Sequence, residues 1–558
     1  MYKNFDIKTF LQDVNNSNIN KLVTGTETLD AAAEIFEEKF RSILDYHAPM
    51  KTVQIRKNYS AFISEETKDL ISVRKVLQEE VSKTGNPVLL KEFRYKCKEV
   101  KREVKTDEKK YFEANFSEEA GVTNAWRTAN EILGTTKNLA PTVIKHQEEN
   151  EKPVLVTSPK KIATIFNNFF RNKVEKLRNK TNKPSSILPT DRLKNWLKKR
   201  PEPPPSFKIK KVDKVILRKA IKRMKGKRGH GVDTIDSYSL KLASPLIEDS
   251  LLHLVNLSIA NNTFATPWKP QLIFPLHKKK EKTKVENFRP VSHLVEVGKL
   301  CEYIVYEQIL EHFNVNKLFH PNHHGSLSNH STATALIQLT DMWLEAAEMT
   351  ELSGACMIDQ SAAYDLLCHM ILQEKLGLYN FDQGSISWIM SYLSNRTQAV
   401  QVESKVSNFL ECGDHGVPQG SILGGLLHVI NSNDFPDCHE EGESVVYVDD
   451  DTDSVHSNDP VQLKNMMQKE VNNSVSWLQD NRLCVAGDKS KFLVIGTKQL
   501  RSSKLTNLLS INVDGQEIQE TESEKLLGVV VNNQLTWQHH LHGDEENFGL
   551  IPQLKQRV

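Results

Sequence analysis

Two apolar, strand-like segments of this sequence end in carboxylates. Asp359 closes the apolar stretch of GACMIDQSAAYDLL, and Asp365 follows six residues later, where a helix is predicted to begin. In SVVYVDDDTDSVHS, an apolar strand leads to Asp449 and Asp450 at a predicted tight turn, after which the chain returns from Thr452 to His456. Neighbouring carboxylates repel each other and resist desolvation, so a structural protein gains little from them unless a cation binds.

The chemistry that suits these carboxylates is metal binding. Mg²⁺ takes oxygen ligands, usually one or two carboxylates together with substrate phosphates. Two such ions ~4 Å apart can activate an attacking 3′-hydroxyl and stabilise a leaving pyrophosphate. An adjacent Asp pair alone is more often a solvated turn, so this hypothesis depends on the surrounding motifs.

The elements that must position the carboxylates follow a mixed pattern. From about residue 270, strand-like runs occur at QLIFPL, GACMID, QAVQVE, SVVYVD, CVAGDKSKFLVIG and LLGVVV. Helical periods lie between them at 294–314, 332–349, 367–378 and 461–480. This order predicts an α+β fold, and no internal repeat is visible.

The first half of the chain is predicted to be largely helical. Apolar positions at helical spacing indicate helices at 28–48 and 158–178, and 64–116 forms one or two charged helices broken near residues 85–87. Residues 201–205 (PEPPP) form a stiff linker and a candidate boundary. The apolar stripe from 212 to 224 lies opposite a Lys/Arg face that could meet phosphate.

Composition is typical of a soluble globular protein. The chain has 558 residues, 39% hydrophobic and 26% charged, which predicts two to four structural units. The net charge is only +2, but basic residues cluster before residue 290 and carboxylates gather around 434–459 and 513–546, as in an enzyme that holds nucleic acid and metal. For the basic stretch RYKCKEVKREVKTDEKK alone, a solvated helix face is favoured.

Cysteine and targeting signals predict an intracellular protein. The seven cysteines are scattered singly, so neither a zinc knuckle nor a disulfide framework is indicated. No apolar run reaches the length of about 18 residues that a membrane span needs, and the N-terminus lacks the pattern of a signal peptide.

Further motifs surround the two acidic segments in chain order. They are KGKRGHGVD (225–233), Trp268-Lys269 with LIFPLHKKK and NFRPVS (287–292), His324-Gly325 with Ser331-Thr332, IDQSAAYD (358–365), GVPQGSILG (416–424), YVDD (447–450), DKSK (488–491) and Leu527-Gly528. On these motifs, residues 210 to 540 resemble the reverse transcriptases of non-LTR (LINE-type, jockey-like) retrotransposons. Any single motif is weak, but the ordered series is specific.

The resemblance implies a right-hand polymerase fold with fingers, palm and a partial thumb, preceded by a largely helical N-terminal region. The expected domains are a pre-polymerase linker region at 1–200, a basic extension of the fingers at 206–256, fingers and palm at 257–500, and a partial thumb at 501–558. No endonuclease or Cys-His knuckle is recognisable, so we expect either a truncated polyprotein or a gene model made from a retroelement fragment.

The implied activity is RNA-directed DNA polymerisation in retrotransposition. A primer 3′-hydroxyl would attack the α-phosphate of a dNTP opposite an RNA template, with two Mg²⁺ ions or, as a substitute, Mn²⁺. The expected partners are therefore an RNA template, a DNA primer or target, and dNTPs, without a membrane. A polymerase of this kind would act in the cytoplasm as a ribonucleoprotein and in the nucleus when active.

The resemblance also implies the residues that hold the metal ions. Asp359 and Asp449 would ligate both ions, with Asp450 as a supporting carboxylate, and the backbone carbonyl of Gln360 would be a further ligand. Lys489 resembles a late-palm lysine that could donate a proton to pyrophosphate, although an exposed turn lysine explains it equally well.

A second group of residues is implied in nucleotide binding. Lys278 and Arg289 would clamp the triphosphate, although contact with a phosphate backbone explains them equally well. Tyr364 would place a ring under the sugar and so exclude a 2′-hydroxyl; without the motif it would be an ordinary core aromatic. Gln419 and Gly420, in a tight turn, would approach the template–nucleotide pair.

Several positions depart from the family pattern. Asp451 and Asp453 follow the Asp pair, so four carboxylates are expected to crowd one site and disturb metal geometry. The other departures are Gln360 for a Leu, Gly425 for a Pro, His428 for an aromatic or aliphatic residue, and Ser326-Leu327 for an aromatic residue and an Arg.

Three rival interpretations follow. One is a decayed, non-catalytic retroelement fragment that acts at most as an RNA-binding protein, for which Asp451 and Asp453 are the best support. The second, a viral RNA-dependent RNA polymerase, is disfavoured by Tyr364 and by the Pro-Gln-Gly turn. The third, a group II intron maturase, is disfavoured because the region from Trp268 to Pro290 looks more like the LINE type.

Overall fold

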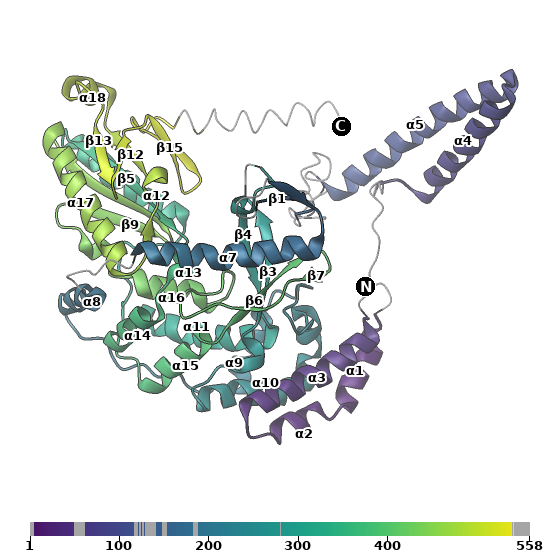
Figure 1. The fold of residues 1–558 in the computed structure, drawn as a ribbon, viewed down its shortest axis with the longest axis horizontal. Helices are drawn as coiled ribbons and strands as arrows, with labels where there is room; N and C mark the ends of the chain where they lie inside the picture. The colour runs from purple at the N-terminus through teal and green to yellow at the C-terminus, as the bar shows by residue number, and fades with distance from the viewer. Residues whose placement is uncertain are drawn as a thin grey trace. The chain divides into compact units, whose positions relative to one another are not determined.

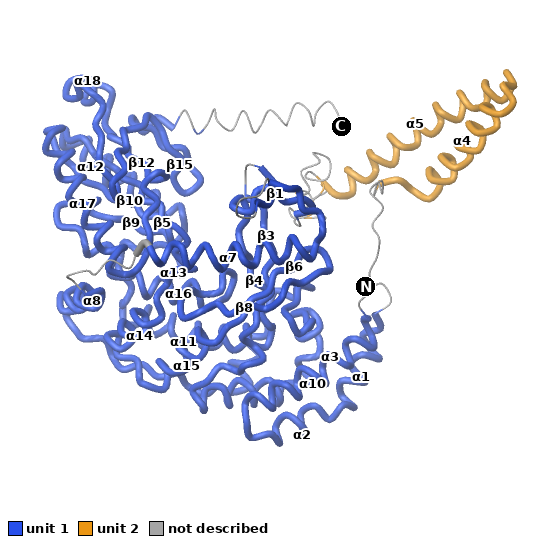
Figure 2. The backbone as a smooth tube through the Cα atoms, viewed as in Figure 1, with its two compact units in different colours: residues 1–49, 140–545 blue, residues 50–139, 546–558 orange. Residues whose placement is uncertain are grey.

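The chain forms two compact units. The computed structural model describes residues 5–49, 62–116, 141–147, 153–181, 188–278 and 281–537, together with residues 121, 124, 126, 128 and 540. One unit comprises residues 1–49 and 140–545, and the other comprises residues 50–139 and 546–558 (Figure 2). Within the described residues, no helix is long and apolar enough to cross a membrane.

The described helices of the smaller unit form a hairpin. α4 (Glu65–Thr84) ends at Gly85, which has φ +58°, and α5 (Pro87–Asn115) begins directly after it. The carboxylate of Asp107 accepts hydrogen bonds from the backbone N–H and the hydroxyl of Ser64, at 2.9 and 2.7 Å. The predicted break near residues 85–87 is confirmed. It arises because a left-handed glycine ends one helix and a proline suits the first turn of the next.

The N-terminal helices belong to the larger unit. α1 (Ile7–Asn16), α2 (Ile19–Thr24) and α3 (Leu29–His47) lie against α10 (Ser237–Ala260), as Figure 1 shows. The side chain of Asn20 fixes this contact, because it donates to the carbonyl of Leu246 at 2.8 Å and accepts from the Ser250 hydroxyl at 2.7 Å. The helix predicted at 28–48 is confirmed, and it is part of the core of this unit.

A central sheet carries both acidic segments. β5 (Leu352–Ser361) lies in the middle, with β10 (Asp450–Ser457) and then β9 (Glu443–Tyr447) on one side. On its other side β5 pairs with β11 (Cys484–Val485) and β12 (Lys491–Ile495), and every pairing is antiparallel.

The two faces of this sheet are covered by different helices. α17 (Pro460–Asp480) packs on the face that carries Cys356 and Ile358, and α12 (Thr332–Glu348) packs on the face that carries Ala355 and Val445. Because successive side chains of a strand point to opposite faces, Asp359 continues the α12 face and Gln360 continues the α17 face.

A second sheet lies beside the first and is joined to it by one long helix (Figure 1). Its strands are β4 (Phe288–His293), β3 (Gln271–His277), β6 (Thr397–Val402), β7 (Lys405–Val406) and β8 (Leu410–Glu411). The helix α7 (Pro159–Thr181) packs Phe166 against Phe288, while Val174 and Leu177 at its other end pack on the core of the central sheet. α7 therefore contacts both sheets.

Further elements complete the described chain. The helices are α8 (Pro189–Lys198), α9 (Lys214–Arg223), α11 (Glu296–Val315), α13 (Ala363–Leu366), α14 (His369–Leu378), α15 (Gln383–Leu393), α16 (Leu423–Ser432) and α18 (Lys498–Lys504), with 3-10 turns at Thr266–Trp268, Val285–Asn287, Pro436–Cys438 and Gly487–Lys489. The strand pairs are β1 (Ile144–His146) with β2 (Val154–Val156), β13 (Ser510–Val513) with β14 (Gln516–Gln519), and β15 (Ser523–Leu526) with β16 (Val529–Asn532).

The predicted α+β architecture and helical N-terminal region are confirmed, with two differences in the strands. CVAGDKSKFLVIG forms β11 and β12 rather than one strand, because the 3-10 turn at Gly487–Lys489 separates them. LLGVVV spans a hairpin, since Leu527 (φ +48°) and Gly528 (φ +96°) turn the chain between β15 and β16. Periodicity alone does not detect such a turn inside an apolar run.

Candidate active site

The antiparallel register of β5 and β10 brings the two acidic segments together. Asp450 pairs directly with Asp359, and Asp449 lies in the two-residue turn that joins β9 to β10. Side chains directly opposite each other in such a pair have Cβ atoms about 5 Å apart. Partial burial, together with the nearby carboxylates of Asp449 and Asp359, raises the pKa of Asp450 to about 6. The site therefore concentrates negative charge.

The turn before Asp449 is strained and is supported from two sides. Val448 has φ +67°, a conformation that a β-branched residue rarely adopts and that costs about 1–3 kcal/mol. The Nε2 atom of His428 lies 3.2 Å from the carbonyl oxygen of Val448. Gly325 abuts the turn on another side, where a Cβ atom would collide with the backbone nitrogen of Val448. The predicted His324-Gly325 motif thus leaves room for the turn.

Cationic side chains surround the carboxylates. Asp359 and Asp449 line a cleft of about 1640 Å³, together with Lys278, Arg289 and Lys489. The Nζ atom of Lys489 lies 3.5 Å from a carboxylate oxygen of Asp359. Burial, and repulsion from Lys173, Arg289 and Lys489, lower the pKa of Lys278. The described cations are therefore crowded enough that a bound polyanion would relieve their repulsion.

Lys173 is a member of this cluster that the sequence did not reveal. It lies on α7, in the same cleft wall as Phe169 and Phe170. The apolar spacing that predicts a helix at 158–178 is the available signal, because an apolar helix face must pack on a core. Which core it meets follows from tertiary structure alone.

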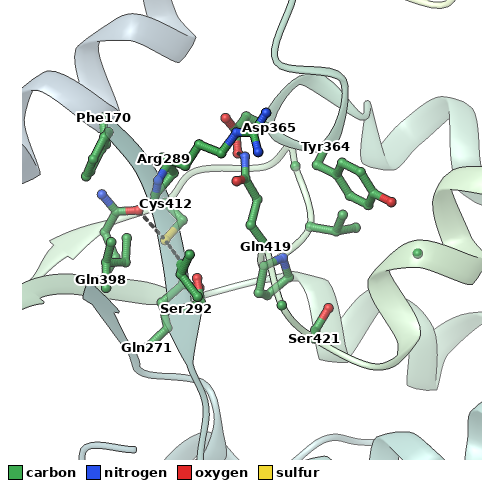
Figure 3. Close-up of a pocket in the computed structure, with 18 of the residues that line it drawn as sticks. Phe170, Gln271, Arg289, Ser292, Tyr364, Asp365, Gln398, Cys412, Gln419 and Ser421 are labelled. Atoms are coloured by element: carbon green, nitrogen blue, oxygen red, sulfur yellow. Dashed lines mark hydrogen bonds between the residues drawn. The ribbon is translucent and has the colours of Figure 1, made fainter. Parts of the chain in front are cut away.

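The predicted Gln419 and Gly420 lie in a loop that docks on β4. The carbonyl of Gln419 accepts a hydrogen bond from the backbone N–H of Ser292 at 2.9 Å, and Gly420 has φ +105°. The side-chain amide of Gln419 donates to Asp365 at 2.8 Å, and Figure 3 shows it reaching toward that residue. Burial raises the pKa of Asp365, against the effect of the Gln419 hydrogen bond. The loop is thereby held at the cleft wall.

Tyr364 lies in the same wall, close to Asp449. Its ring stacks on that of His428, with centroids 4.9 Å apart and an interplanar angle of 26°. Burial and the Asp449 carboxylate raise the pKa of Tyr364 to about 12, while the nearby Ser326 hydroxyl acts to lower it. Burial also lowers the pKa of His428, which favours its neutral form.

Asp451 and Asp453 lie on the opposite face of β10 from Asp450, so the expected crowding of four carboxylates in one site is wrong. The side-chain amide of Gln360 donates to Asp451 at 2.5 Å. The ring of His439 lies 3.0 Å from Asp453, which also accepts a hydrogen bond from the Ser474 hydroxyl at 2.6 Å. Side chains alternate along a strand, which is why the two sets are separated.

The donor set at the front of the sheet fits a hard divalent cation. Within the described ranges, no three or more His, Cys, Asp or Glu side chains form a metal cage by themselves. Mg²⁺ sites that act on phosphates commonly have one or two protein carboxylates, and water and substrate oxygens supply the rest. Asp359 and Asp449, open to the cleft and joined by Asp450 at their edge, provide that kind of partial shell.

Comparison with known proteins agrees with this geometry. Residues 276–531 match the family model of the reverse transcriptase (RNA-dependent DNA polymerase). The chain is 25% identical over 347 residues to the RNA-directed DNA polymerase from mobile element jockey of Drosophila funebris, a match that covers 60% of this chain and 36% of that protein. It is 26% identical over 345 residues to the probable RNA-directed DNA polymerase from transposon BS of Drosophila melanogaster, covering 60% and 37%.

A third relative, the probable RNA-directed DNA polymerase from transposon X-element of Drosophila melanogaster, is 23% identical over 329 residues, covering 58% of this chain and 35% of that protein. The chain thus spans about a third of the length of the curated relatives that it matches.

Proposed function

We propose that this chain, whose residues 276–531 form a reverse-transcriptase domain distantly similar to those of the jockey, BS and X-element retrotransposons, is an RNA-directed DNA polymerase that acts in retrotransposition. It would join a primer 3′-hydroxyl to the α-phosphate of a dNTP on an RNA template. Reverse transcriptases generally use a divalent metal, and two Mg²⁺ ions, or Mn²⁺ in their place, are proposed here.

The observation that carries the proposal is the pairing of Asp359 with Asp450 beside the Asp449 turn. Asp359 and Asp449 would hold the two ions, with Asp450 and the backbone carbonyl of Gln360 as further ligands. When bound, the ions would supply charge stabilisation and an activated 3′-hydroxyl. The antiparallel register of β5 and β10 would place these ligand oxygens side by side on adjacent strands.

The other cleft residues would bind and orient the nucleotide. Lys278 and Arg289 would hold the triphosphate, and Lys489, next to Asp359, would donate a proton to the leaving pyrophosphate. Gln419 and Gly420 would contact the template–nucleotide pair. Tyr364 would exclude the 2′-hydroxyl of an rNTP, which its position in the cleft wall supports.

The same proposal assigns the parts of the fold. The central sheet with α12 and α17 would be the palm, the β3–β4–β6 sheet would belong to the fingers, and β13 to β16 would start a partial thumb. The domains would be a pre-polymerase region at 1–200, a fingers extension at 206–256, fingers and palm at 257–500, and a partial thumb at 501–558.

Primer extension tests the activity. The full chain is incubated with poly(rA)/oligo(dT), dTTP and Mg²⁺, beside Asp449→Ala and the control Asp341→Ala, which removes an exposed carboxylate on α12. The wild type and the control should extend the primer. Asp449→Ala should lose on the order of 10³-fold in rate, because a metal ion supplies several kcal/mol of transition-state stabilisation. Wild-type extension no higher than that of Asp449→Ala would instead favour a non-catalytic RNA-binding protein.

Substitution of Tyr364 tests the sugar assignment. Tyr364→Ala should incorporate rUTP more readily on the same template, since the ring that meets the 2′-hydroxyl is removed. Unchanged discrimination between dTTP and rUTP would show that Tyr364 serves only to fill the wall.

A further inference from the structure

We propose that His428 is a positioning residue that ties the ring of Tyr364 to the turn carrying Asp449, so that sugar selection and carboxylate placement are set by one buried side chain. The inference rests on the proposed polymerase function and deepens it. It concerns a position where the chain departs from the family to which it is similar.

The geometry places His428 between two parts of the site. It lies on α16 and is fully buried. One face of its ring stacks on Tyr364, at a centroid distance of 4.9 Å. Its Nε2 atom lies 3.2 Å from the carbonyl oxygen of Val448. A single rigid ring thus contacts both the proposed sugar gate and the residue before Asp449.

The bond to Val448 acts on the peptide unit that precedes Asp449. Because Val448 is held at φ +67°, the turn has a strain of about 1–3 kcal/mol that its surroundings must offset. A neutral imidazole that donates from Nε2 fixes the carbonyl of this unit, and with it the direction in which Asp449 leaves the turn. The other ring nitrogen of His428 has no hydrogen-bond partner among the described residues, which agrees with this tautomer.

Histidine combines two properties that an ordinary core residue at this position would not. A phenylalanine would offer a ring face to Tyr364 but no donor for the Val448 carbonyl. An aliphatic residue would offer neither. The carbonyl would then lose a hydrogen bond that typically contributes about 1 kcal/mol.

A second departure supports the assignment. Ser326, which stands where the family often has an aromatic residue, lies beside Tyr364, and its hydroxyl acts to lower the pKa of the Tyr364 side chain. The side chain of Tyr364 thus has Ser326 beside its hydroxyl and His428 against the face of its ring. Two residues that depart from the family pattern thus lie next to the proposed sugar gate.

The test separates the two contacts with complementary variants. His428→Phe keeps the ring and removes the donor, while His428→Gln keeps an amide donor at a similar reach and removes the ring. Both are assayed as full chains on poly(rA)/oligo(dT) with dTTP and with rUTP, over a Mg²⁺ titration. His312→Phe is the matched control, since His312 packs beside Phe207 and Phe381 and does not line the cleft.

His428→Phe should lower kcat for dTTP about fivefold, the equivalent of one hydrogen bond, and should raise the Mg²⁺ concentration for half-maximal rate. Its dTTP/rUTP discrimination should be unchanged. His428→Gln should show the reverse: a kcat near that of the wild type and discrimination lowered by at least about threefold. His312→Phe should match the wild type in all three readouts.

Ser326→Ala changes an exposed residue outside the buried core. This variant tests the inference if the His428 variants do not fold. It should reduce dTTP/rUTP discrimination by a larger factor than it changes kcat or the Mg²⁺ dependence. Equal effects of His428→Phe and His428→Gln on kcat and discrimination, or no effect of either, would overturn the inference, as would unchanged discrimination in Ser326→Ala. If the wild type itself does not extend the primer, the proposed function fails and the inference falls with it.

Discussion

The two faces of β10 place Asp side chains in opposite environments. On the front face, Asp450 lies opposite Asp359 and beside Asp449, three carboxylates that repel one another at the edge of a basic cleft. On the back face, Asp451 and Asp453 are fully buried, and each has its own partner. Carboxylates with built-in partners contribute to the fold, whereas carboxylates that crowd one another remain available to a cation. The partners, more than the number of Asp residues, distinguish the two roles.

The largest expected difference is in the free energy of unfolding, between the variants Asp453→Asn and Asp450→Asn. Asp453→Asn leaves His439 buried without its counter-ion and should lower the free energy of unfolding by about 3 kcal/mol, the lower end for a broken buried pair because His439 can lose its proton. Asp450→Asn removes like-charge repulsion and should leave this free energy unchanged or raise it. Urea unfolding of the two variants measures both values. Equal losses in both would mean that the two faces do not differ.

A smaller effect is expected from the second buried pair, Gln360 with Asp451. Gln360→Leu leaves the buried carboxylate of Asp451 without its hydrogen-bond donor and should lower the free energy of unfolding by about 1–3 kcal/mol. Gln360→Leu combined with Asp451→Ala should cost less than the sum of the two single changes, because the residues are in direct contact. A double-mutant cycle in urea gives the coupling, and strict additivity would show that the hydrogen bond contributes nothing.

The smallest expected effect is a pH dependence of stability, which arises from the buried His439–Asp453 pair on the back face of β10. Burial acts to lower the pKa of His439, but the Asp453 carboxylate outweighs it and holds this pKa well above its usual value. The folded state therefore retains this proton where the unfolded chain loses it. The stabilisation is complete below the ordinary histidine pKa of about 6.5 and is lost as the pH rises through the raised value. Thermal melting across this range should show a decline that Asp453→Asn lacks.

The sequence predicted that the front-face carboxylates lie at strand ends, because each one ends or directly follows an apolar run that is recognisable from the local sequence. The helices at 28–48, 64–116, 332–349 and 461–480 were predicted for the same reason: their apolar spacing is internal to the segment. The separation of Asp451 and Asp453 from Asp450 was also readable, because strand side chains alternate, but the proximity of four Asp residues in sequence suggested a single cluster.

The partners were not readable. Gln360 meets Asp451 only through the register of β5 and β10, and His428 meets Val448 and Tyr364 only after α16 has packed. Gln360 and His428 both depart from the family pattern. The role of such a residue depends on the side chain that it contacts in the fold. That side chain is distant in sequence, so the spacing of motifs along the chain does not predict the contact.

The position of α7 has a consequence for where this chain can be shortened. Its aromatic end covers the second sheet, its other end covers the central sheet, and Lys173 lies in the cleft between them. All of this precedes residue 276, where the family match begins. A protein trimmed to that border would expose the apolar surfaces of two sheets and lose one wall of the cleft. The smallest fragment that keeps both sheets covered must therefore start before residue 159, upstream of the segment that matches the family model.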